Sequence, residues 1–343
     1  MNFPEVLVFD SEDDEGAAGD ELAQQVTALG IDNPFVLNSR HGEGLARHIR
    51  AESERPPGDA NQEWAAELGR RAHHEGADAI VAIGGGRCLD IAKLAAARAG
   101  LTIVSVPTQL SHDGICSPVA VVPNEDNVSE SLGAIAPRLV FLSTPTLVRA
   151  PLESVRAGLG DLLANPLALR DWALATERGL EQAEQRAWDL SVESFELIEP
   201  YLEDDAGVSI KDPEFLRKLA DALVLSGMAM IQAGTSRPAS GGEHEVSHAI
   251  DELFGGRGMH GAQVAFGCIF SVALYGEDTA AFRRRLEGLG LPQDPEDLGL
   301  SREDVLRVLL AAPDTRPGRF TILEASDLDE AEARELVRSI WPD

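Results

Sequence analysis

Residues 79–99, AIVAIGGGRCLDIAKLAAARA, decide the fold of this chain. Five apolar residues followed by three glycines predict a buried strand that ends in a tight turn. The apolar spacing from residue 88 to residue 99 then predicts a helix. A strand, a glycine turn and a helix in this order are the start of a βαβ unit, so the sequence predicts a parallel sheet covered by helices.

The same alternation extends over the first half of the chain. Strands are expected at 6–9, 35–37, 79–83, 102–106 and 138–142, helices at 21–29, 62–74 and 88–99, and loops at 12–19 and 56–58. The second half has helical spacing only, at 152–156, 167–175, 181–201, 213–232, 243–253, 262–274, 279–287, 302–310 and 329–340. We therefore expect an α/β nucleotide-type domain over residues 1–147 and an all-α domain over residues 148–343. A ligand is expected in the cleft between them.

Composition limits the possible partners and the location. The 343 residues carry 29 basic and 58 acidic side chains, which gives 29 − 58 = −29 formal charges. This charge argues against binding to nucleic acid or to an anionic membrane, because both need Lys and Arg against phosphates. The three cysteines are scattered, which is typical of a reducing cytoplasm. Neither a signal peptide nor an apolar run of about 18 residues is present, so no membrane insertion is expected.

Gly84, Gly85 and Gly86 form a turn that suits the close approach of a phosphate group. Glycine tolerates positive φ and leaves the backbone accessible, and free N–H groups at a helix start attract anions. The segment matches neither the GxGxxG nor the GxxxxGK[ST] pattern, so a tight turn without a ligand is an equal alternative. Asp90 would lie in the first helical turn, where a carboxylate also complements the helix dipole.

A second polar loop, SVPTQLSHDGICSP at residues 105–118, follows the next expected strand. Ligands of open parallel sheets bind beyond the carboxyl ends of the strands. Ser111, His112 and Asp113 would offer a hydroxyl, an imidazole and a carboxylate there. A turn held by its own Ser and Asp side chains is the alternative, but two such loops after adjacent strands favour binding.

Three of the eight histidines lie within seventeen positions, which favours a metal site. His244 and His248 are four residues apart and project from one helix face, and His260 follows. Catalytic Zn²⁺ takes three nitrogen or oxygen ligands and keeps an open fourth position. HEVSH at 244–248 has the spacing of the zinc-hydrolase motif HExxH, in which both histidines are ligands. Asp161, at an expected helix start, is either a carboxylate ligand or an N-cap.

Together these segments resemble the glycerol-1-phosphate dehydrogenase family, within the superfamily of iron-containing alcohol dehydrogenases and dehydroquinate synthases. The matching stretches are GGGRCLDIAK (84–93), SVPTQLSHDGICSP (105–118), GLGD (158–161), RDW (170–172), AGTSRPASGGEHEVSHAID (233–251) and MHGAQVAFG (259–267). SHDG…SP combined with GxEHxxSH is specific for this branch. The resemblance implies a Rossmann-like domain, an all-α domain and a divalent metal between them, in the dehydroquinate synthase-like arrangement.

The resemblance also implies the site residues. NAD or NADP would contact Gly84, Gly85, Gly86, Arg87, Cys88, Leu89, Asp90, Thr108, Gln109, Leu110, Ser111 and Ser117. Zn²⁺, or another divalent metal, would bind Asp161, His244 and His260. The substrate would contact Asp113, Asp161 and His248, with Asp113 and His248 as the catalytic residues. On this basis HEVSH misleads, because His248 belongs with the substrate and not with the metal.

The implied reaction is the reversible reduction of dihydroxyacetone phosphate by NADH or NADPH to sn-glycerol 1-phosphate. Zinc would act as a Lewis acid on the carbonyl oxygen, and His248 would pass a proton to it. We assign the phosphate of this small substrate to Arg237, whose planar fork suits the anion, with a structural ion pair as the alternative. In a chain of charge −29, the cleft would then have a sign opposite to that of the surface.

Two departures from the family leave other interpretations open. The first sixty residues fit poorly, which leaves the choice between NAD and NADP undecided, and Gln109 and Leu110 replace small residues beside the expected nicotinamide. The alternatives are a paralogue acting on another polyol phosphate or sugar-derived ketone, a dehydroquinate-synthase-like cyclase, a metallohydrolase and a non-catalytic binding protein. Scarce Lys disfavours the cyclase, the two loops disfavour the hydrolase, and the complete ligand set disfavours the binding protein. A homo-oligomer is the base-rate expectation.

Overall fold

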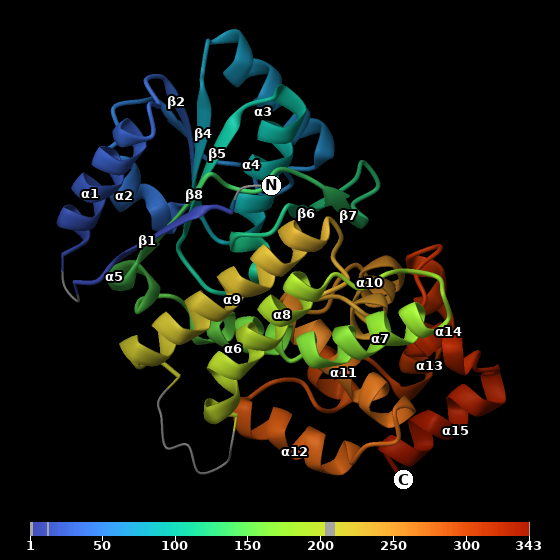
Figure 1. Cartoon of the computed structure of the whole chain (residues 1–343). Helices are drawn as coiled ribbons and strands as arrows, with labels where there is room; N and C mark the ends of the chain where they lie inside the picture. The colour runs from blue at the N-terminus through green and yellow to red at the C-terminus, as the bar shows by residue number, and fades with distance from the viewer. Residues whose placement is uncertain (1–2, 12–13, 203–209, 343) are drawn as a thin grey trace.

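The computed structural model describes residues 3–11, 14–202 and 210–342, and its first part is built on a six-stranded sheet (Figure 1). The strands are β1 (Glu5–Phe9), β2 (Pro34–Asn38), β3 (Ser53–Glu54), β4 (Ala79–Gly84), β5 (Thr102–Pro107) and β8 (Leu139–Ser143). Their order is β1-β8-β5-β4-β2-β3, and every pairing is parallel. The predicted parallel α/β sheet is therefore confirmed.

Alternate residues of the central strand face opposite helical layers, which explains its unbroken apolar run. The helices of this part are α1 (Glu15–Ala28), α2 (Glu43–Ala46), α3 (Gln62–His74) and α4 (Gly86–Ala99). Val81 and Ile83 pack in an apolar cluster with α1 and α2, whereas Ile80 and Ala82 pack with α3 and α4. Both faces of β4 are thus buried, and its carboxyl end points at the interface with the second part.

The prediction of an acidic loop over residues 12–19 is wrong from residue 15 onward, because α1 begins at that residue. The Asp14 carboxylate accepts a hydrogen bond from the Ala17 N–H at 2.8 Å and caps the helix. Gly19 lies directly against the ring of His48, so tertiary packing also stabilises this acidic turn. Residues 12 and 13 lie outside the described residues.

The sequence analysis missed an antiparallel hairpin formed by β6 (Val119–Pro123) and β7 (Ser129–Gly133). Its strands are short, and only one face is buried, so the apolar signal is weak. The usable signal was the turn: the Asn124 side chain accepts from the N–H groups of Asp126 and Val128, and Asn127 has a φ of 61°. The hairpin extends from the sheet toward α10 (Figure 1).

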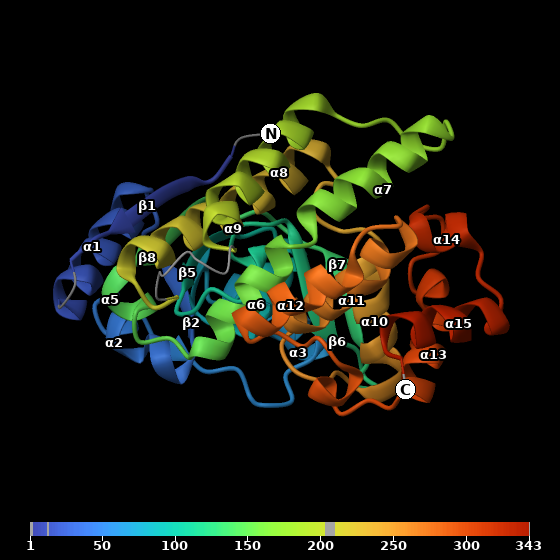
Figure 2. The same ribbon diagram turned by 90° about the horizontal axis from the view of Figure 1, so that it is seen from below.

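The second part is all-helical, as predicted, and its last helices lie at the end of the molecule opposite α1 (Figure 2). The short helix α5 (Thr144–Leu147) follows β8, and the α-helices after it are α6 (Leu152–Leu162), α7 (Asn165–Glu177), α8 (Gln185–Ile198), α9 (Pro213–Ala233), α10 (Gly242–Phe254), α11 (His260–Leu274), α12 (Thr279–Leu289), α13 (Arg302–Ala311), α14 (Ile322–Ser326) and α15 (Glu330–Ile340). The predicted division after residue 147 falls just after α5. One apolar cluster spans both parts, so this boundary stays a prediction. Within the described ranges, no helix has the length and apolarity to span a membrane.

Candidate functional site

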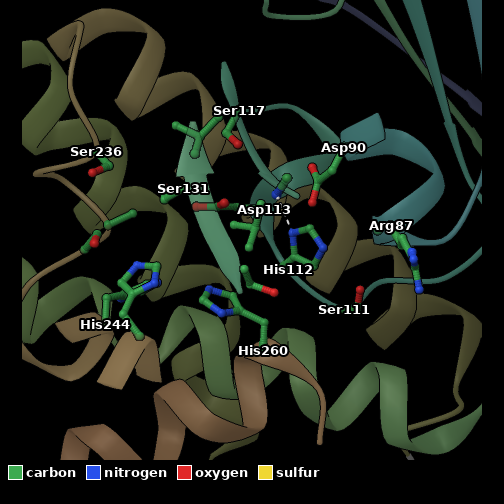
Figure 3. Close-up of a pocket in the computed structure, with 18 of the residues that line it drawn as sticks. Arg87, Asp90, Ser111, His112, Asp113, Ser117, Ser131, Ser236, His244 and His260 are labelled. Carbon is green, nitrogen blue, oxygen red and sulfur yellow. Dashed lines mark hydrogen bonds between the residues drawn. The ribbon is translucent and has the colours of Figure 1, made fainter. Parts of the chain in front are cut away.

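A cavity of about 370 Å³ lies between the sheet and the helical part, and predicted site residues from both parts point into it (Figure 3). Those that line it are Gly86, Arg87, Asp90, Gln109, Ser111, Asp113, Ser117, His244, His248 and His260. The fold thus brings together side chains that are up to 174 residues apart in the sequence, 260 − 86 = 174.

His244 and His260 line this cavity, and buried Asp161, which is not among the lining residues, converges with them. One ligand atom from each lies within 4.8 Å of the others, and both histidine Nε2 atoms are 3.7 and 3.8 Å from Asp161 Oδ1. Burial opposes ionisation of Asp161, but the nearby imidazoles, first that of His244, hold its pKa below the usual value. Two imidazoles and one carboxylate at this separation fit a divalent metal with an open position.

The expectation that Asp161 begins a helix is wrong, because it lies in the last turn of α6. The glycines before it serve close packing instead of a turn. A Cβ on Gly158 would lie 2.5 Å from the Leu110 carbonyl oxygen, and one on Gly160 would lie 2.2 Å from that of Gly261. Gly158 therefore lets α6 lie against the second loop, and Gly160 lets α6 approach α11 closely enough for Asp161 to lie near His260.

His248 lies on the same face of α10 as His244 but outside the metal cluster. Its Nε2 atom is buried at the cavity wall and has no hydrogen-bond partner among the described residues. Glu245, the base of a zinc-hydrolase interpretation, instead accepts from Thr321 Oγ1 at 2.9 Å and does not line the cavity. The geometry therefore gives no support to the hydrolase alternative.

The glycine turn presents an open helix N-terminus to the cavity. Gly85 is the N-cap of α4 and provides no side-chain cap, so the first amides remain available to an anion. A Cβ on Gly86 would lie 2.0 Å from His112 Nε2, and one on Gly85 would lie 2.7 Å from Gln109 Nε2. Glycine is required here because two side chains of the second loop lie directly on the turn.

The remaining predicted cofactor residues divide into two groups. Cys88, Leu89 and Leu110 are buried in the apolar core, and Gly84 ends β4, so only their backbones can face a cofactor. Thr108 and Gln109 line a second cavity of about 230 Å³, whose other walls are Glu15, His41, Thr146, Arg149, Ala150 and Pro151. Gln109 lines both cavities.

Buried Lys93 links the two cofactor loops. Its Nζ lies 2.9 Å from Asp90 Oδ1 and donates to the carbonyls of Gly114 at 2.8 Å and of Val119. A charge this deep is tolerated because it is paired and fully hydrogen-bonded. The pair holds Asp90 at the cavity wall and the second loop against α4.

Comparisons with known proteins agree with this geometry. The sequence model of the iron-containing alcohol dehydrogenase family matches residues 2–151. Glycerol-1-phosphate dehydrogenase [NAD(P)+] of Hyperthermus butylicus is 39% identical over 259 residues, 76% of this chain and 73% of that protein. The Methanocorpusculum labreanum protein of the same name is 33% identical over 94% of this chain and 90% of its own.

The chain belongs to the glycerol-1-phosphate dehydrogenase family. A probable glycerol dehydrogenase from Sinorhizobium meliloti has the same fold, with a TM-score of 0.79 at 22% identity over 99% of this chain and 97% of its own. Sulfoacetaldehyde reductase from Bifidobacterium kashiwanohense, solved with NAD+, has a TM-score of 0.72 at 13% identity over 100% and 98% of the two chains. These neighbours confirm the predicted architecture.

The assignment of Arg237 to the substrate phosphate is wrong for this member of the family. Its Nε atom donates to both carboxylate oxygens of Glu181, at 2.9 and 2.8 Å, and Nη1 donates to the Phe320 carbonyl at 2.9 Å. The side chain is 1% exposed and does not reach the cavity. Its planar fork is thus occupied by a structural ion pair. Arg316, which was not predicted from the sequence, lines the cavity together with Arg87.

Glu243 is a second residue that was not predicted from the sequence, and it contacts the predicted metal ligand His244. Its Oε1 lies 3.0 Å from His244 Nδ1, leaving Nε2 to face Asp161, and also accepts from the Gly241 N–H. Such carboxylate–histidine pairs set the tautomer of a metal ligand and raise its basicity. The signal was available, because Glu243 directly precedes His244.

We expect Glu243→Gln to lower zinc affinity by about 10- to 100-fold, because the amide keeps the shape but loses the charge that raises His244 basicity. Competition with a chromogenic chelator measures this change. Glu335→Gln, on exposed α15, is the control of equal charge change. Zinc affinity equal to that of the wild type would contradict an orienting role for Glu243.

Proposed function

We propose that this chain is a metal-dependent, NAD(P)H-linked oxidoreductase that reversibly reduces dihydroxyacetone phosphate to sn-glycerol 1-phosphate. One observation carries the proposal: His244 and His260, two members of the cluster with Asp161, line the same cavity as Gly86 of the glycine turn. A carbonyl group at the cluster would therefore lie in the space that a cofactor at the turn enters. The names of the family's curated members support this substrate and NAD(P) as the cofactor.

We propose Zn²⁺ as the metal, since two imidazole nitrogens and a carboxylate oxygen match its preferred ligands. When bound, the ion supplies Lewis acidity toward a carbonyl oxygen. The described cluster offers three ligands, which leaves a position for substrate. Elemental analysis of the protein purified without added metal tests the identity of the ion, with iron as the outcome that would replace zinc.

His248 and Asp113 would hold the transferred proton. Burial, and then the charge of Arg316, keep the pKa of His248 well below its usual value, so its neutral ring can donate or accept at the unpaired Nε2. Burial, and then the charge of Asp161, raise the pKa of Asp113 to about 8, so its carboxyl group is mostly protonated at neutral pH. The Asp113 N–H also donates to Asp161 Oδ2 at 2.9 Å, which orients the metal ligand.

The proposal is tested by following the oxidation of NADH and of NADPH in the presence of dihydroxyacetone phosphate. The loss of the absorbance band of the reduced nicotinamide, at ~340 nm, measures turnover. We expect turnover that is lost after chelation and restored by zinc, with the product identified as the 1-phosphate enantiomer. Turnover of other small ketones alone would favour the paralogue alternative. Absence of turnover with restored zinc would refute the dehydrogenase proposal for this substrate.

The expected location and assembly belong to the same proposal. We propose a cytoplasmic homo-oligomer whose partner is the small phosphorylated substrate, with no nucleic acid or membrane partner. The buried cysteines, Cys88, Cys116 and Cys268, are unpaired, which agrees with a reducing compartment. Light scattering of the purified protein measures the oligomeric state.

A further inference from the structure

Arg316 joins three distant segments at one wall of the cavity. Its Nη1 atom donates to Ser236 Oγ at 3.2 Å and to Ser240 Oγ at 3.0 Å, both in the loop after α9. Its Nη2 atom donates to Ser131 Oγ at 3.1 Å, on β7 of the hairpin that extends from the sheet. All four residues line the cavity, and Figure 3 shows Ser131 and Ser236 among its walls.

The hydroxyl groups of these three serines can still donate hydrogen bonds to a ligand. A hydroxyl group has one hydrogen and two lone pairs, so an oxygen that accepts from Arg316 still has its own hydrogen to give. The guanidinium has donors and no acceptor. This wall therefore offers donors to any acceptor that enters, which suits an anion with several oxygens.

The positive charge at this wall is not neutralised locally. Arg319 donates from Nη2 to Ser236 Oγ at 3.0 Å and from Nη1 to the Ser240 carbonyl, so it supports the same loop. No described carboxylate forms a salt bridge with Arg316 or Arg319, although more distant Glu243 and Glu245 offset part of their charge. Burial, and then repulsion from Arg316, lower the pKa of Arg319 to about 10. Two guanidiniums that form no salt bridge with a described carboxylate leave this wall able to bind an anion.

This wall is close to the predicted chemistry. Arg316, His248 and His260 line the same cavity, so this wall faces the space next to the predicted substrate histidine and a predicted metal ligand. The part of the cavity predicted to bind the cofactor has a different lining, with Gly86 and Arg87 from α4. An anion at Arg316 would thus belong to a small molecule that also reaches the metal cluster.

We propose that Arg316, Ser131, Ser236 and Ser240 bind the phosphate group of the substrate, and that Arg319 positions the loop that carries two of these serines. The proposal rests on the function proposed above and identifies the part of the site that selects phosphorylated over unphosphorylated ketones. A phosphate dianion matches this wall because its three terminal oxygens are acceptors only.

The test compares two substrates in zinc-loaded protein. Arg316→Ala should raise the KM for dihydroxyacetone phosphate about 100-fold, because charge-assisted hydrogen bonds to the phosphate are lost. The KM for dihydroxyacetone, which has no phosphate, should change less than about threefold. Arg316→Lys should recover part of the loss, because an ammonium keeps the charge but not the fork. The KM for NADH should stay constant. Arg285→Ala, on the exposed surface of α12, is the control of equal charge change.

Inorganic phosphate provides a readout that needs no turnover. Calorimetry should show phosphate binding to the zinc-loaded wild type, weakened at least tenfold in Ser240→Ala and lost in Arg316→Ala. Phosphate binding in a protein that reduces no ketone would refute the proposed function and retain this subsite. Absence of phosphate binding to the wild type, or equal KM changes for both substrates, would overturn the subsite. Zinc content and thermal midpoint identify a variant that has not folded, in which case the Ser240→Ala titration decides.

Discussion

Asp161→Asn is expected to leave the protein without zinc and to lower turnover by at least about 10³-fold. The substitution keeps the size of the side chain and an oxygen that can accept from the Asp113 N–H, but removes the only anionic ligand of the cluster. Two imidazoles alone hold zinc weakly, and the lost Lewis acid contributes several kcal/mol to the reaction. Each ~1.4 kcal/mol is tenfold in rate, which gives this magnitude.

The reference for Asp161→Asn is the wild type after chelation. Both should have the same thermal midpoint, and neither should gain stability when zinc is added, whereas the chelated wild type should regain it. Asp59→Asn, on an exposed loop, provides the conservative control. One zinc per chain retained in Asp161→Asn, measured by elemental analysis, would show that the metal lies elsewhere.

Gly261→Ala is expected to destabilise the fold by about 3 kcal/mol and to weaken zinc binding at the same time. A Cβ at this position would lie 1.9 Å from the Ala157 carbonyl oxygen, a backbone atom of α6 that cannot rotate away. The reciprocal contact, from a Cβ on Gly160 to the Gly261 carbonyl oxygen, would be 2.2 Å. The methyl group would therefore push α11 away from α6 and separate His260 from Asp161.

Urea unfolding and chelator competition measure the two effects of Gly261→Ala. Gly58→Ala is the matched control, because a Cβ there meets no atom within 4 Å and the expected change is within about 0.5 kcal/mol. Loss of stability with unchanged zinc affinity would show that the helix crossing does not position the ligands. If Gly261→Ala kept both the wild-type stability and the wild-type zinc affinity, the two helices would be able to separate without loss of free energy.

The strands and most helices could be predicted because their signals are local. In β4, five apolar residues between an acidic residue and three glycines allow one arrangement, a buried strand with a turn. Residues 15–19 and the β6–β7 hairpin had no such signal. The acidic start of α1 is stabilised by the Asp14 cap and by packing on His48, and the hairpin by contacts with parts of the chain far away in sequence.

Part of the candidate site could likewise be predicted from local spacing, and part could not. The spacing of His244 and His248 predicted that both face one direction, and the structure places both at the cavity. Spacing alone could not separate the predicted metal ligand from the predicted substrate residue, because that assignment depends on where Asp161 and His260 lie. Those positions follow from the glycine contacts between α6 and α11.

The two arginines show what only the tertiary structure decided. By itself the sequence determined the order of strands, turns and helices, the glycine turn and the cluster of histidines, since these depend on residues near one another along the chain. It offered Arg237 for an anion because of the polar loop around it, but its guanidinium binds Glu181, 56 residues earlier, whereas Arg316 binds Ser131, 185 residues earlier, inside the cavity. The partner of a charged side chain is chosen by three-dimensional proximity and burial, and neither is encoded in local spacing.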